Sequence, residues 1–106
     1  MAWAYLLLAG VLEVVWASAM KHSEGFTRLG ASAVTIVAMI ASFWLLALAM
    51  RTLPLGTSYT IWTGIGAVGA FIVGITMMGE AVSAMRIAAA LLIVTGLVLM
   101  KLSSTT

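Results

Sequence analysis

One carboxylate interrupts the first apolar stretch of the sequence. In AGVLEVVWASAM, residues 9–20, Glu13 is the only charged side chain. A charge at the centre of a bilayer costs about 2.5–3.5 kcal/mol on insertion scales, so such a residue usually faces a cavity or a partner. No basic residue lies in mid-span to pair with it. Glu13 is therefore our candidate for a site that binds a proton or a cation. A glutamate that bonds a neighbouring helix, or one that is simply protonated and inert, is the plainer alternative.

The neighbours of Glu13 support a binding site. Gly10, Trp16 and Ala17 lie three or four positions away, so they share one side of a helix with the carboxylate. We expect Gly10 to leave space beside the carboxylate. Trp16 offers a flat wall, and aromatic faces attract cations. Ordinary packing is an equally good interpretation of Trp16 taken alone.

Polar and aromatic residues of later stretches are further pocket candidates. Ser42 lies midway along the second apolar stretch, where it either bonds Glu13 or packs at a close helix contact. Tyr59 and Trp62 are three positions apart in the third stretch, so both face one cavity or pack on each other.

Small residues mark two other places. Gly64 and Gly66 lie within the third stretch, and glycines in a membrane helix allow close packing or a bend. In the fourth stretch Ala89, Ile93 and Gly96 share one helix face that carries no polar group. We interpret this face as a seam between two copies of the chain.

Several classes of chemistry are not expected. The chain has no cysteine and a single histidine, so a metal site would rest on its three acidic residues, and we expect no metal and no cofactor. We find no nucleophile–base pair or phosphate-binding loop, which argues against an enzyme. The five basic residues are scattered rather than clustered, which argues against a nucleic-acid partner.

The elements that carry these residues are predicted to be membrane helices. Of 106 residues, 64% are hydrophobic and only 8% are charged, so the chain lacks the polar residues to cover a water-exposed surface. The apolar stretches predict helices at about 3–20, 29–50, 55–78 and 84–102, each long enough or nearly so to cross about 30 Å of hydrocarbon. We expect an all-α membrane protein with one four-helix transmembrane domain, 1–106, and no cleaved signal peptide, because the first stretch lacks a basic start.

The basic residues leave the orientation in the membrane open. With four crossings, Lys21, Arg28 and Arg86 fall on one side, and Arg51 and Lys101 on the other. Orientation follows the Lys/Arg imbalance, and three against two is almost none. Either other signals fix one orientation, or the chain inserts both ways and pairs as an antiparallel, dual-topology dimer.

Three motifs together resemble the small multidrug resistance family of four-helix transporters. They are LEVVWA (12–17), GFTRL (25–29) and LPLGTSYTIWTGIGAVGA (53–70), and the resemblance covers nearly the whole chain. Trp16 and the TSYTIWTGIG segment look most like the guanidinium-exporter subtype, whereas MKHSEGFTRL and SFWLLA also resemble the drug-exporting subtype. Two positions depart from the pattern: His22 stands where the guanidinium subtype commonly has tyrosine, and Ala89 where a glycine is frequent.

The resemblance implies an antiparallel homodimer in a bacterial inner membrane that couples proton entry to cation export. Glu13 is then the shared proton and substrate site, with Gly64 and Gly66 as a flexible part of the third helix. The implied pocket residues are Trp16, Ser42, Tyr59 and Trp62. Two alternatives remain: export of quaternary ammonium or other lipophilic drug cations, and a non-transporting subunit of a heteromer.

Overall fold

Four long helices make up the computed structural model, which describes residues 1–103. They are α1 (Ala2–His22), α2 (Leu29–Ala49), α3 (Leu55–Met77) and α4 (Ala84–Ser103). Their bounds differ from the predicted ranges by at most two residues. Each is long and apolar enough to cross a membrane. The prediction of an all-α chain with four membrane-spanning helices is confirmed.

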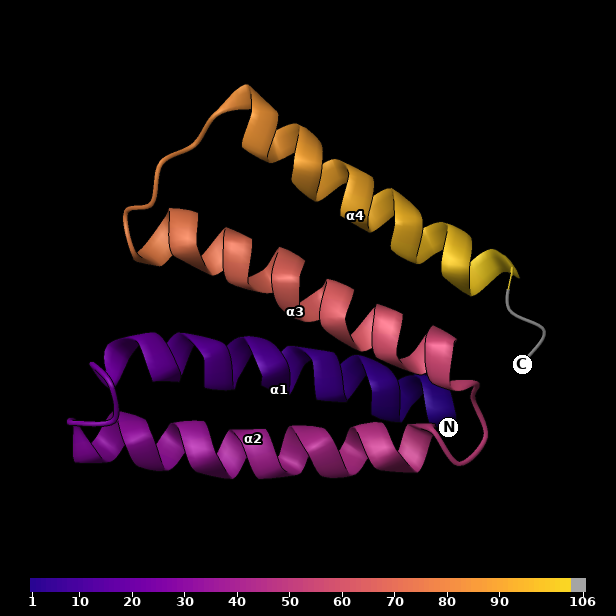
Figure 1. Cartoon of the computed structure of the whole chain (residues 1–106), viewed down its shortest axis with the longest axis horizontal. Helices are drawn as coiled ribbons and strands as arrows, with labels where there is room; N and C mark the ends of the chain where they lie inside the picture. Colours follow the sequence, from indigo (N-terminus) through magenta and orange to yellow (C-terminus); the bar gives the residue numbers. More distant parts are fainter. Residues whose placement is uncertain (104–106) are drawn as a thin grey trace.

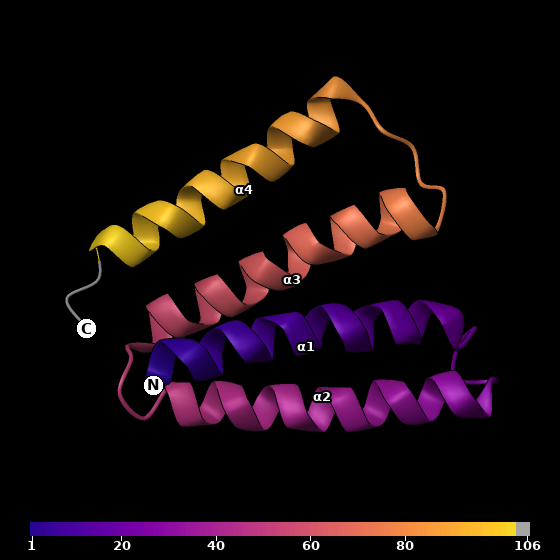
Figure 2. The same ribbon diagram turned by 180° about the vertical axis from the view of Figure 1, so that it is seen from behind.

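Three of the helices form a layer and the fourth diverges from it (Figures 1 and 2). α1 packs between α2 and α3, while α4 follows only α3 and is furthest from it near the 78–83 connection. The molecule is accordingly flat, with extents of 43 × 34 × 16 Å. At its C-terminal end α4 also reaches α1 through side chains, because Lys101 Nζ lies 4.4 Å from the centre of the Trp3 ring. One side of α4 therefore has little protein against it.

The connection between α1 and α2 is a tight, hydrogen-bonded turn. The Ser23 hydroxyl donates to the Met20 carbonyl at 2.7 Å and accepts from the Phe26 backbone N–H at 3.0 Å. Gly25 has the left-handed φ of 75° that glycine favours, but Glu24 (50°) and Phe26 (68°) share that conformation. The buried Ser23 side chain thus fixes this turn.

The other two connections begin helices as the sequence indicates. Pro54 stands at the N-terminal boundary of α3, where its missing N–H is of no consequence. Ser83 caps α4 by accepting the Arg86 backbone N–H on its hydroxyl at 3.2 Å. Pro54 and Ser83 thus set where α3 and α4 begin. The start of each helix sets the positions of the residues that follow, such as Tyr59 on α3 and Arg86 on α4.

The buried core is small and lies among α1, α2 and α3. It includes Leu6, Ala9, Leu46, Ala49, Leu53, Ile61 and Trp62. α4 contributes no buried residue over its described length. Large apolar side chains such as Trp44 and Leu92 are 66% and 73% exposed, which suits a surface that faces lipid or another protein.

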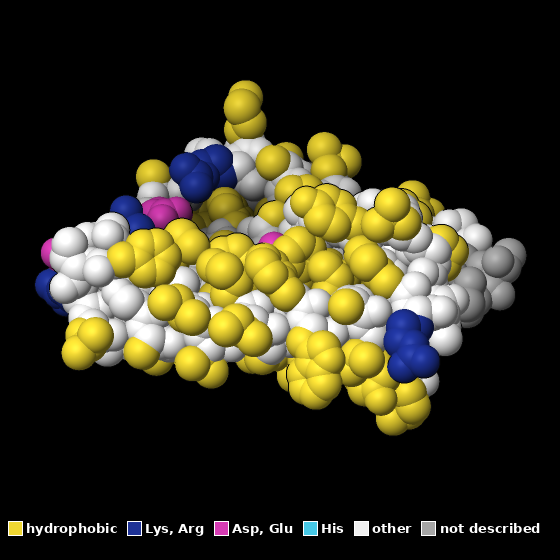
Figure 3. Space-filling view, turned by 60° about the horizontal axis from the view of Figure 1, so that its bottom comes forward, with side chains coloured by type: hydrophobic (Ala, Val, Ile, Leu, Met, Phe, Trp, Pro, Cys, Tyr) yellow, Lys and Arg dark blue, Asp and Glu magenta, His cyan; other side chains and the backbone are white. Residues whose placement is uncertain are grey.

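Most charged side chains lie at the two ends of the molecule, and hydrophobic ones cover the middle except for a small acidic patch (Figure 3). The 23–28 and 78–83 connections share one end (Figure 1). The connection between α2 and α3 and both termini share the other (Figure 1). Two ion pairs form at the first end: Arg28 Nη2 to Glu24 Oε1 at 2.9 Å, and Arg86 Nη2 to Glu80 Oε1 at 3.8 Å. Both glutamates are exposed as well as paired.

Candidate functional site

Glu13 lies on α1 against α3, inside the hydrophobic middle of the molecule. Its carboxylate contacts Gly66, where the Cβ of any other residue would overlap Oε1. Oε1 is buried and has no hydrogen-bond partner among residues 1–103. Buried polar atoms are nearly always bonded, because leaving one without a partner costs free energy. Glu13 Oε1 is therefore an acceptor whose donor must come from outside the described residues of one chain.

Four aromatic rings from three helices form a row that starts at Trp16, three residues after Glu13 on α1. Trp16 of α1 meets Phe43 of α2 edge-on, with ring centres 6.2 Å apart. Phe43 in turn lies 5.6 Å from Trp62 of α3, and Trp62 lies 5.7 Å from Tyr59. The indole Nε1 of Trp16 is also buried without a hydrogen-bond partner in the described chain. The predicted pocket residues Trp16, Tyr59 and Trp62 are thus joined through one ring that was not predicted, Phe43.

Ser42 holds the three helices together near Glu13. Its hydroxyl donates to the Ala9 carbonyl of α1 at 2.7 Å and accepts from Nε1 of Trp62 at 3.0 Å. The predicted alternative of a bond between Ser42 and Glu13 is wrong, because the hydroxyl faces the backbone one turn before the carboxylate. Ser42 orients the Trp62 ring and anchors α2 on α1, so it positions the site without a hydrogen bond to Glu13.

The glycines act as contact surfaces between helices. Gly10 faces Ile65, and a Cβ at Gly10 would lie 2.7 Å from its Cγ2. The expectation that Gly10 leaves open space beside the carboxylate is therefore wrong; α3 fills that space. On α3, Gly64 receives Leu97 of α4 and Gly66 receives Glu13. α3 is a continuous helix through both glycines.

The predicted seam residues lie along the open groove between α3 and α4. Ala89, Ile93 and Gly96 are all exposed. Ile93 and Gly96 line a cavity of about 530 Å³ together with Tyr59, and Ala89 and Ile93 line one of about 260 Å³ together with Arg86. A partner that contacts this seam would therefore enter the groove.

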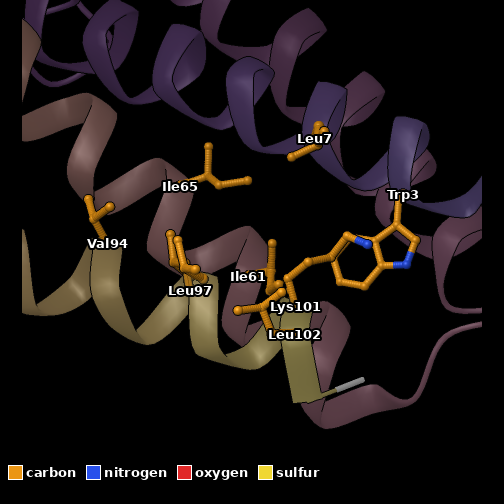
Figure 4. A pocket seen from close by; sticks show the side chains of 9 residues that line it. Trp3, Leu7, Ile61, Ile65, Val94, Leu97, Lys101 and Leu102 are labelled. Carbon is orange, nitrogen blue, oxygen red and sulfur yellow. The ribbon is translucent and has the colours of Figure 1, made fainter. Parts of the chain in front are cut away.

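A separate apolar cavity of about 350 Å³ lies among α1, α3 and α4 (Figure 4). Leu7, Ile65, Val94 and Leu97 line it, with Trp3 and Lys101 toward one end. Glu13 is not among its lining residues. This cavity is distinct from the carboxylate site and offers no acceptor for a cation.

Comparison with known proteins assigns the family. The model of the Small Multidrug Resistance protein family matches residues 1–93. The chain belongs to the small multidrug resistance family. The resemblance drawn from its three motifs is thereby confirmed, and four spans in a bacterial family make it a multi-pass protein of the inner membrane.

Curated relatives match almost from end to end. Proteins named guanidinium exporter in Escherichia coli K12 and in Citrobacter freundii are 54% and 56% identical to this chain over 104 residues. The guanidinium exporter of Salmonella typhimurium is also 56% identical. Each alignment covers 98% of this chain and 99% of the relative. These relatives are named as transporters, in agreement with the prediction that the chain is not an enzyme.

Proposed function

We propose that this protein is a proton-coupled antiporter that exports guanidinium and related small cations. The observation that carries the proposal is the buried, unbonded carboxylate oxygen of Glu13, one helical turn before Trp16, which begins the ring row with Phe43 and Trp62. The 54–56% identity to guanidinium exporters over 98% of the chain supports the choice of substrate.

The chemistry of the cation fits this arrangement. Guanidinium is planar, and a carboxylate can accept two of its N–H bonds side by side. Aromatic rings beside the carboxylate attract the cation to their faces. Glu13 supplies the charge, and Trp16 and Trp62 supply the walls.

Competition for one carboxylate couples the two fluxes. A protonated Glu13 has lost the negative charge that holds guanidinium, so proton and cation exclude each other. If the empty site does not cross the membrane, proton entry is coupled to the exit of the cation. The proton gradient then drives export.

Transport further requires two copies of the chain in an antiparallel homodimer. Two inverted chains supply the symmetric halves that alternating access uses. Two Glu13 carboxyl groups would then share one cavity and titrate in coupled steps. In this proposal Gly64 and Gly66 allow α3 to bend, and Ala89, Ile93 and Gly96 receive the partner in the α3–α4 groove. A C-terminal tag should be accessible from both sides of the membrane; a tag found on one side only would exclude the dual topology.

The test is guanidinium exchange in liposomes with a proton gradient. Wild-type protein should move guanidinium against its gradient, and Glu13→Gln should abolish the movement because the amide binds neither a proton nor the cation's charge. Glu24→Gln is the matched control, since it removes a carboxylate that is 63% exposed and paired with Arg28. Normal exchange by Glu13→Gln would refute the role of Glu13.

Export of a larger quaternary ammonium is the second candidate. The stretches MKHSEGFTRL and SFWLLA, which resemble the drug-exporting subtype, favour a bulkier cation. Competition between guanidinium and a large aromatic cation decides between the two. A chain that forms no homodimer and binds neither cation would instead be a non-transporting subunit of a heteromer.

A further inference from the structure

The chain holds a guanidinium group of its own at one membrane face. The guanidinium carbon of Arg86 lies 5.7 Å from the centre of the Phe71 ring, and its Nη2 lies 3.8 Å from Glu80 Oε1. A carboxylate together with an aromatic ring is the same pair of groups that the proposed function assigns to the substrate at Glu13. Arg86 therefore shows that Glu80 and Phe71 accept a guanidinium between them.

Glu80 is held in place independently of Arg86. Its backbone N–H donates to the Gly74 carbonyl at 3.0 Å, at the C-terminal end of α3. Its carboxylate lies against Gly74, where a side chain would overlap it. The acceptor is thus positioned by the helix end rather than by its ion pair.

Arg86 can leave without disturbing α4. Its backbone N–H is bonded to the cap residue Ser83, whereas its side chain is 49% exposed and its ion pair with Glu80 is long. Exposed ion pairs of this kind are weak and exchange with solvent ions. A guanidinium ion at sufficient concentration can therefore displace the Arg86 side chain from Glu80.

We propose that Glu80 and Phe71 form a second, peripheral guanidinium site, in which the substrate replaces the Arg86 side chain at the membrane face. The inference rests on the proposed function for the identity of the substrate. The site is weaker than the one at Glu13, because it is half exposed and has a tethered competitor.

The second ion pair at this end provides a matched control. Arg28 and Glu24 are four residues apart, and their closest atoms lie 2.9 Å from each other. Within residues 1–103 no aromatic ring lies over Arg28, whereas one lies over Arg86. Glu24 should therefore bind guanidinium less well than Glu80, although both carboxylates are accessible.

The three phenylalanines of the chain allow both sites to be observed in one experiment. Phe43 lies in the ring row near Glu13, Phe71 lies under Arg86, and Phe26 lies in the 23–28 turn. We would label all three with 4-fluorophenylalanine and assign the ¹⁹F resonances by single replacements with leucine. Guanidinium chloride is then titrated into the purified protein, with sodium chloride at equal ionic strength as the reference.

The expected result is two separate responses. Phe43 should shift at low guanidinium concentration and only when Glu13 is intact. Phe71 should shift at higher concentration, in wild-type protein and in Glu13→Gln alike. Glu80→Gln should abolish the Phe71 response and leave that of Phe43. Arg86→Gln should lower its midpoint by about two- to fivefold, the factor by which a half-exposed ion pair competes.

Three outcomes would overturn the inference: a Phe71 response equal to that in sodium chloride, one that survives Glu80→Gln, or one matched in size by Phe26. Unchanged Phe26 and Phe43 resonances in Glu80→Gln establish that this variant is folded. A missing Phe43 response contradicts the proposed function instead, so the two failures are distinguishable.

Discussion

Gly66→Ala should displace the Glu13 carboxylate with the smallest possible change on α3. The Cβ of an alanine at position 66 would overlap Glu13 Oε1 and lie 2.8 Å from its Cγ. Relieving such overpacking costs about 1–3 kcal/mol. If the cost falls on the geometry that binds the substrate, guanidinium affinity drops by about 5- to 150-fold, at about 1.4 kcal/mol per factor of ten.

Gly69→Ala separates this effect from general overpacking. Its Cβ would also meet a side chain of α1, but the contact is with a methyl group of Val14 rather than with a carboxylate. Both substitutions gain the same helix propensity of about 1 kcal/mol. Guanidinium affinity measured by titration calorimetry should fall for Gly66→Ala and remain near wild type for Gly69→Ala. Wild-type affinity in Gly66→Ala, or an equal loss in both variants, would refute the reasoning.

Two further changes test the surroundings of the site. Ser42→Ala should destabilise the protein by about 1–3 kcal/mol in a denaturant titration, because Nε1 of Trp62 and the Ala9 carbonyl each lose a partner; an unchanged midpoint would contradict the supporting role of this hydroxyl. Trp16→Gly should lower guanidinium affinity by about 2- to 30-fold, the range of a cation–π contact of 0.5–2 kcal/mol, while a bulky aromatic cation binds better in competition. The opposite order of preference would show that Trp16 does not limit the size of the cation.

The helices themselves were predictable from the sequence because membrane spans depend on length and hydropathy. Local signals also indicate where helices begin: Pro54 marks the start of α3, and the Ser83 hydroxyl caps α4. Such features depend on residues near one another in the chain. They require no knowledge of how the helices are rotated about their axes.

The partners of the site residues depend on that rotation and were not predictable. From the sequence, the Ser42 hydroxyl could bond either Glu13 or a backbone carbonyl of α1. The packing of α2 on α1 determines that its partner is the Ala9 carbonyl. In the same way, Gly10 and Gly66 look alike in the sequence, yet one receives Ile65 and the other receives the carboxylate.

Two further features, the place of Phe43 in the ring row and the Glu80–Arg86 ion pair, were not predictable from the sequence for other reasons. α2 is apolar on all sides, so no periodicity distinguishes Phe43 from its neighbours as a member of the ring row. The pairing of Glu80 with Arg86 depends on the path of the 78–83 connection, which has no helical spacing. Family resemblance pointed to the motif residues but not to these two features.

Proton release on guanidinium binding tests the central claim most directly. Purified protein in weakly buffered detergent solution should release protons when guanidinium is added. Because a protonated Glu13 does not hold the cation, affinity should fall as pH falls, by up to about tenfold per pH unit for each proton displaced. Glu13→Gln should release none. Binding without proton release at any pH, or equal release by Glu13→Gln, would contradict competition between proton and cation for this carboxylate.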